Sequence, residues 1–200
     1  MKYFFTALLL LFPLWSYTQI YQAGQSYQTN SAHFTRWDFS AGGVLSVNTL
    51  KESRSSETLF DAQYGAELRG LFYPFSFLGI GLQGQYFTAE VSSSPINEYN
   101  QTRLGLLVKA IPAPEFFPRS YFIFGYGNTK REAELFKKWA VKENSPYYML
   151  GLGAEEKIWK QLTGAIEVRG VYNKKKNLGS LFTYSHHWEY ELALRLGWLF

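Results

Sequence analysis

The sequence predicts an all-β protein, an eight-stranded antiparallel up-and-down transmembrane β-barrel. From Phe34 to Phe200 the apolar residues recur every second position, which is the strand period. Aromatic residues make up 19% of the chain and charged residues 18%, with 17 Gly, which is too apolar for disorder and too rich in Gly and aromatics for a helical bundle. No apolar run after residue 19 reaches the roughly 18 residues of a transmembrane helix. A closed barrel is the other structure that satisfies every backbone polar group in lipid.

The first residues have the pattern of a secretory signal peptide, so we expect the chain to be exported. Lys2 precedes the apolar stretch 4–15, and the small residues Ser16 and Thr18 favour cleavage before Gln19. We therefore assign residues 1–18 to the signal peptide, the polar segment 19–33 to a flexible lead-in, and residues 34–200 to the barrel. The alternative is a membrane anchor helix, for which the apolar stretch is short.

Eight segments alternate between an apolar and a polar face. The last is the clearest, because Leu192, Leu194 and Leu196 share one face while Glu191 and Arg195 share the other. The predicted strands are 34–48, 59–72, 77–90, 99–111, 120–129, 146–157, 162–172 and 188–200. The connections alternate between short (73–76, 112–119, 158–161) and long (49–57, 91–98, 130–145, 173–184). Short turns at one end and long loops at the other are typical of bacterial outer-membrane barrels.

Aromatic side chains gather at the strand ends, where amphipathic rings settle at a lipid–water boundary. One predicted girdle comprises Phe34, Trp37, Phe72, Tyr73, Phe75, Phe77, Trp159, Trp198 and Phe200. The other comprises Phe60, Tyr86, Tyr99, Tyr148, Tyr172 and Trp188. The alternative is a water-soluble barrel with these aromatic residues in its core.

The size of the side chains decides which face points inward. An eight-stranded barrel is too narrow to hold so many Trp, Tyr, Phe and Leu side chains, whereas most of the Gly residues lie on the charged face. We therefore expect the charged face inside, where an unpaired ion costs several kcal/mol and acids must pair with bases. The predicted interior ion network comprises Asp38, Asp61, Glu67, Arg69, Arg103, Lys109, Glu155, Glu167, Arg169, Glu189, Glu191 and Arg195.

The alternating terminus YELALRLGWLF resembles that of the small outer-membrane barrel superfamily, which includes OmpX-like proteins and the OmpA transmembrane domain. The resemblance covers about residues 34–200. It implies a location in the bacterial outer membrane, and it implies that Phe200 ends the strand that the barrel-assembly machinery reads. Some small barrels of this kind modify lipid A.

Ser185, His187 and Glu189 are candidates for such an enzyme, since they share one strand face beside His186 and combine a nucleophile, a base and a carboxylate. The alternative is that the two histidines lie at the rim and pair with acids. The loops 130–145 and 173–184 are basic and either bind lipopolysaccharide phosphates or form a solvated surface. Residues 132–142 are compatible with a short amphipathic helix.

The sequence contains no cysteine, Gly-rich phosphate loop, metal-ligand cluster or basic nucleic-acid groove, so we expect no cofactor and no nucleic acid partner. The expected protein is a monomer with a closed interior and a structural or surface-interaction role. The alternatives are a lipid A-modifying acyltransferase or deacylase and a narrow solute channel.

Overall fold

The computed structural model describes residues 37–52, 58–89, 96–113, 118–135 and 139–200. The predicted signal peptide and lead-in, together with Phe34, lie outside the described residues. None of the described residues forms a helix with the length and hydropathy that crossing a membrane requires.

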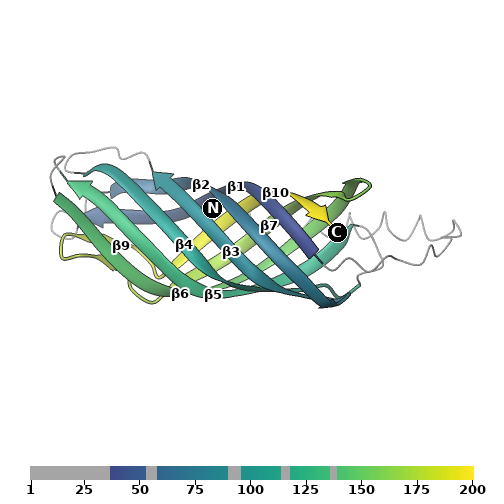
Figure 1. The fold of residues 1–200 in the computed structure, drawn as a ribbon. Helices are drawn as coiled ribbons and strands as arrows, with labels where there is room; N and C mark the ends of the chain where they lie inside the picture. Colours follow the sequence, from purple (N-terminus) through teal and green to yellow (C-terminus); the bar gives the residue numbers. More distant parts are fainter. Residues whose placement is uncertain (1–36, 53–57, 90–95, 114–117, 136–138) are drawn as a thin grey trace, which may run out of the picture. The chain divides into compact units, whose positions relative to one another are not determined.

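Eight long antiparallel strands form a closed ring in the described part of the chain, which confirms the predicted barrel (Figure 1). Each strand pairs with the next along the chain, and β10 pairs with β1 from Asp38↔Leu199 to Val47↔Tyr190 to close the ring. The strands are β1 (Trp37–Glu52), β2 (Thr58–Phe75), β3 (Leu78–Ala89), β4 (Ile96–Ala110), β5 (Arg119–Leu135), β6 (Trp139–Trp159), β7 (Leu162–Asn173) and β10 (Trp188–Leu199).

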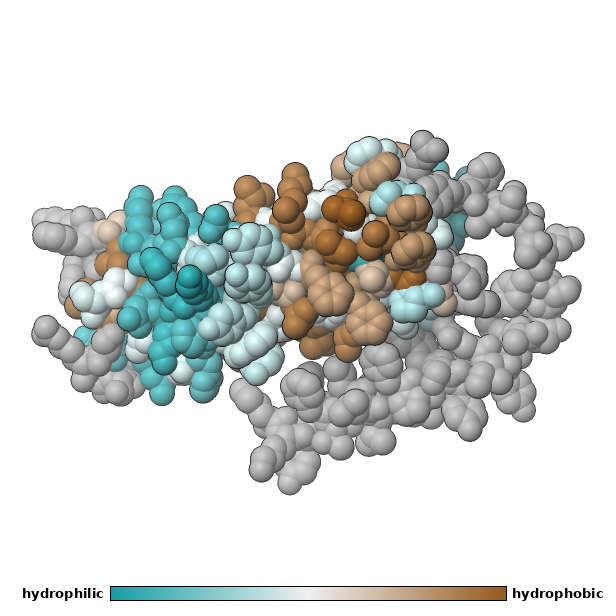
Figure 2. All heavy atoms as spheres, turned by 90° about the horizontal axis from the view of Figure 1, so that it is seen from below, coloured by the Kyte–Doolittle hydropathy of each residue, from teal (hydrophilic) through white to brown (hydrophobic). Residues whose placement is uncertain are grey.

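The polar face points inward, as the sizes of the side chains predict. In β10, Glu191 and Arg195 are buried, whereas Leu194 and Leu196 are about three-fifths exposed. Ten residue steps separate Trp188 from Trp198. At about 3.4 Å per step and a tilt of about 40°, these steps rise ~26 Å, close to the height of the apolar band of an outer-membrane barrel. Figure 2 shows this band as brown spheres beside a hydrophilic zone in teal.

Above the apolar band, β5 and β6 continue as strands over 130–135 and 139–145, where the sequence predicts a loop over 130–145. Lys130 and Lys142 point outward into water, while Arg131 and Ala133 point inward and are buried. The pairing runs on to Leu135↔Trp139, so the helix predicted over 132–142 is wrong for the residues that the structure describes. The alternation continues, but above the lipid its outer face is charged instead of apolar.

A short hairpin, β8 (Asn177–Leu178) and β9 (Phe182–Tyr184), occupies the predicted loop 173–184. β9 pairs with the outer end of β1 through Leu50↔Tyr184 and Glu52↔Phe182. Its apolar side chains join a buried cluster at the outer end of the barrel, which we call the outer cap. The outer cap comprises Leu50, Leu59, Phe60, Ala89, Tyr99, Ala133, Leu178, Phe182 and Tyr184.

A row of aromatic rings marks the outer edge of the apolar band. Tyr126, Tyr148, Tyr172 and Trp188 are direct cross-strand neighbours on β5, β6, β7 and β10, and the rings of Tyr126 and Tyr148 lie 5.2 Å apart. Three aromatic residues predicted for the girdles, Phe60, Tyr73 and Tyr99, are instead buried inside. Phe60 packs in the outer cap, and the two Tyr hydroxyls bond to interior polar groups.

Candidate functional site: the interior ion network

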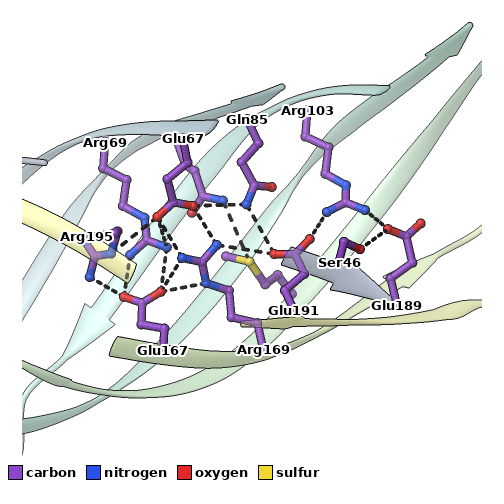
Figure 3. A network of polar contacts seen from close by, with 12 residues as sticks. Ser46, Glu67, Arg69, Gln85, Arg103, Glu167, Arg169, Glu189, Glu191 and Arg195 are labelled. Carbon is purple, nitrogen blue, oxygen red and sulfur yellow. Dashed lines mark hydrogen bonds and ion pairs between the residues drawn. The ribbon is translucent and has the colours of Figure 1, made fainter. Parts of the chain in front are cut away.

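The barrel interior holds as many acids as bases. The described residues include twelve buried charged side chains, six of each sign, so their formal charges cancel. The acids are Asp38, Glu67, Glu155, Glu167, Glu189 and Glu191, and the bases are Arg69, Arg103, Lys109, Arg131, Arg169 and Arg195. Figure 3 shows the members of this set on β2, β4, β7 and β10, whose charged ends point toward one another.

The middle of the network is built on two reciprocal forks between β2 and β7. Arg69 donates from both Nη atoms to the two oxygens of Glu167, each at 2.8 Å. Arg169 donates in the same way to Glu67, at 2.6 and 2.7 Å. Arg195 of β10 joins by pairing with both glutamates, Glu67 and Glu167. Two-pronged contacts of this kind are the strongest that guanidinium groups make, and they fix the positions of both partners.

The outer part of the network is centred on Arg103 of β4. Its guanidinium donates to the carboxylates of Glu189 and Glu191, both on β10. Arg131 adds a second donor to Glu189 at 3.0 Å. Gln85 joins this part to the middle, because its Nε2 lies 3.1 Å from Glu67 and 3.3 Å from Glu191.

A further group, joined to the middle of the network by the Tyr121 hydroxyl, which donates to Glu167 at 2.6 Å, closes the end of the barrel nearer the short turns. Lys109 donates to Glu155 at 2.7 Å and lies 3.6 Å from Asp38. The ring of Tyr121 lies 4.4 Å from the Lys109 ammonium, and the hydroxyl of Tyr73 donates to Asp38 at 3.4 Å. Gly153 provides the room for Tyr121, since a Cβ built on Gly153 would overlap that ring.

The prediction of the network was wrong for Asp61 and omitted Arg131. Asp61 is exposed because the pairing of β1 with β2 shifts at a bulge between Val47 and Leu50, and Phe60 turns inward instead. Arg131 was placed in a loop, although it continues the inward positions of β5. The signal that would have placed it is the alternation of Arg131 and Ala133 with Lys130, Glu132 and Glu134.

The three candidate catalytic residues do not form a relay. The His187 ring nitrogen Nδ1 lies 2.9 Å from the backbone carbonyl oxygen of Asn173, and the ring stacks on Tyr172. Glu189 is fully buried and is held by Arg103 and Arg131. Among the described residues, the Ser185 hydroxyl has no hydrogen-bond partner. A Ser–His–carboxylate mechanism requires these groups to bond in sequence, whereas here each is engaged elsewhere or stands alone.

The last residue, Phe200, lies at the seam where the barrel closes. Its backbone N–H donates to the carbonyl of Trp37 at 2.9 Å, and its side chain is exposed. This placement leaves the ring on the outer surface beside Phe39. Its role as an assembly signal stays a prediction.

No protein-family model and no curated protein matches the sequence. Similar solved structures include Neisserial surface protein A, with 10% identity and a TM-score of 0.58 over 82% of this chain and 97% of that one. Ail of Yersinia pestis is 14% identical, with a TM-score of 0.53 over 83% of this chain and 99% of that one. OprG of Pseudomonas aeruginosa is 12% identical, with a TM-score of 0.55 over 82% of this chain and 97% of that one. The chain therefore shares the fold of the small bacterial outer-membrane β-barrel proteins, and its apolar band fits a location in the outer membrane.

Proposed function

We propose that this chain is a sealed outer-membrane barrel whose role is structural or carried by its outer surface, and that it does not transport solutes. The observation that supports the proposal is the pairing of six buried acids with six buried bases across the barrel interior. A closed interior with balanced charges leaves the surface as the part of the protein that can act on its surroundings.

The energetics of the network favour a closed interior. A hydrated ion that passed through would have to separate the forks Arg69–Glu167 and Arg169–Glu67. Breaking both forks would remove the two-pronged contacts of four buried charges, and a buried charge that loses its partner costs several kcal/mol. The outer cap adds a second, apolar barrier above the network.

Planar-bilayer recording of the full mature chain tests this proposal. The wild-type protein is expected to give no steady conductance. The double variant Arg69→Ala/Glu167→Ala removes both side chains of one fork and keeps the interior charges balanced. It therefore provides a barrel with a wider interior, to which the conductance of the wild type is compared. A steady, large conductance from the wild type would contradict the sealed barrel and favour the narrow solute channel.

The wall of the barrel above the apolar band, which we call the outer wall, also carries a candidate contact for lipopolysaccharide phosphates. Lys130 and Lys142 point outward above the ring pair Tyr126 and Tyr148, at the side of the apolar band where lipid headgroups lie. Glu132 lies between the two lysines, 2.7 Å from one ammonium and 3.4 Å from the other. A phosphate must compete with this carboxylate for the two cations.

The competition makes the phosphate contact testable. In vesicles that contain lipopolysaccharide, Glu132→Gln should increase the amount of lipopolysaccharide that copurifies, and Lys130→Gln/Lys142→Gln should decrease it. Dephosphorylated lipopolysaccharide should abolish the difference. Equal retention by all variants would show that these lysines form only a solvated surface.

A further inference from the structure

Above the lipid, the wall of the barrel is built from partly different strands. β7 ends at Asn173 and β10 begins at Trp188, and the hairpin β8–β9 takes their place beside β1. No backbone pairing joins β8 to β6 among the described residues. The two nevertheless meet, because Val141 of β6 packs against the outer cap, which includes Leu178 of β8. In the described residues, the boundary between β6 and the hairpin is thus a seam without a strand ladder.

One ion pair and isolated hydrogen bonds, instead of a ladder, hold the hairpin to β6. Lys175 pairs with Glu143, and its backbone N–H donates to the Ser145 hydroxyl at 2.9 Å. The N–H of Lys174 donates to the carbonyl of Pro146 at 3.1 Å. By contrast, β9 is joined to β1 by regular strand pairing. The attachment is therefore stronger on the β1 side, which makes β1 the natural hinge.

The hairpin covers interior groups that are linked to the ion network. The Tyr184 hydroxyl meets that of Tyr99, which donates to Gln101 at 2.8 Å. Gln101 in turn donates to Glu189 at 3.3 Å. The Arg131 guanidinium lies 4.4 Å from the centre of the Tyr184 ring. If the hairpin moved, the outer cap and these polar groups would be exposed to the medium outside the membrane.

We propose that the hairpin 174–187 is a gate at the outer mouth, hinged on β1, opening along the seam with β6, and latched by the ion pair of Lys175 with Glu143. This goes beyond the sealed barrel, because the network within the membrane stays closed whether the gate is open or shut. The latch is partly exposed, with 56% of the Lys175 side chain and 20% of the Glu143 side chain accessible. An exposed pair of this kind contributes little to stability, so its removal shifts the balance between the shut and the open gate only modestly.

Thiol labelling measures the opening directly, since the chain contains no cysteine of its own. Leu178→Cys on β8 places a fully buried probe at the seam, for labelling by a charged, membrane-impermeant methanethiosulfonate in lipid vesicles. Leu181→Cys, on the exposed tip, gives the rate without protection. Leu107→Cys, fully buried inside the barrel away from the hairpin, reports any general unfolding.

In the Leu178→Cys background, Lys175→Gln and Glu143→Gln should each raise the labelling rate about two- to fivefold, the effect of losing an exposed ion pair. The swap Lys175→Glu/Glu143→Lys should restore slow labelling. Lys157→Gln, which removes an exposed cation at the opposite end of β6, should leave the rate unchanged. The gate is refuted if both latch variants label at the rate of the intact latch, or if Leu107→Cys reacts as fast as Leu178→Cys.

Discussion

Neutralising Glu167 tests the interior network most directly. This carboxylate accepts both prongs of Arg69, the Nε of Arg169 at 2.6 Å, an Nη of Arg195, and the Tyr121 hydroxyl at 2.6 Å. Glu167→Gln keeps the size of the side chain and removes one charge, so the balance of the twelve buried charges changes from zero to +1. Removing one partner of a buried ion pair costs about 3–5 kcal/mol, because the remaining charge is left without compensation. We expect Glu167→Gln to lower the free energy of unfolding by that amount.

Urea unfolding in lipid vesicles, followed by tryptophan fluorescence and by the gel mobility of the folded barrel, measures this loss. Glu132→Gln is the matched control, since it removes a carboxylate from an ion pair on the outer wall and should cost less than about 1 kcal/mol. The double variant Glu167→Gln/Arg69→Gln restores neutrality and should recover part of the loss. If Glu167→Gln costs no more than Glu132→Gln, the reasoning about buried charge is refuted.

Three further predictions concern the lipid face, a turn and the outer wall. Leu194→Arg places a charge in the apolar band and should lower the free energy of unfolding in lipid vesicles by about 2–4 kcal/mol. Asn144→Arg, above the band, should leave the free energy of unfolding almost unchanged. Equal losses for the two variants would contradict the placement of the band. Lys160 has a positive φ of 39° in the turn between β6 and β7, which strains a residue with a side chain. Lys160→Gly should therefore raise the free energy of unfolding by up to about 1 kcal/mol. A lower free energy of unfolding in urea would argue against strain at this turn. The hydrogen bond from Lys130 holds the pKa of the Glu132 carboxyl below its ordinary value. In an NMR titration, the ion pair should still be intact at the ordinary pKa of a glutamate and be lost only as the pH falls through the lowered pKa. Lys130→Gln should move the titration midpoint of Glu132 to higher pH.

The sequence by itself determined the barrel and the direction of most of its side chains. A strand has a period of two, so the alternation around Glu191, Arg195 and the leucines of β10 assigns each residue to a face without reference to any other strand. The choice of the inward face followed from side-chain size, because the interior of eight strands is narrow. These are local properties, and a single sequence contains them.

The tertiary structure alone decided which charges meet. Arg69 and Glu167 are 98 residues apart, and their fork depends on the tilt and stagger of β2 and β7 around the ring. The inward turn of Phe60 in place of Asp61 depends on a bulge, which inserts a residue without leaving a periodic signal. The hairpin β8–β9 was missed because strands of two and three residues are too short to show a period. Register, bulges and partners arise from the closing of the ring, and only the folded chain fixes them.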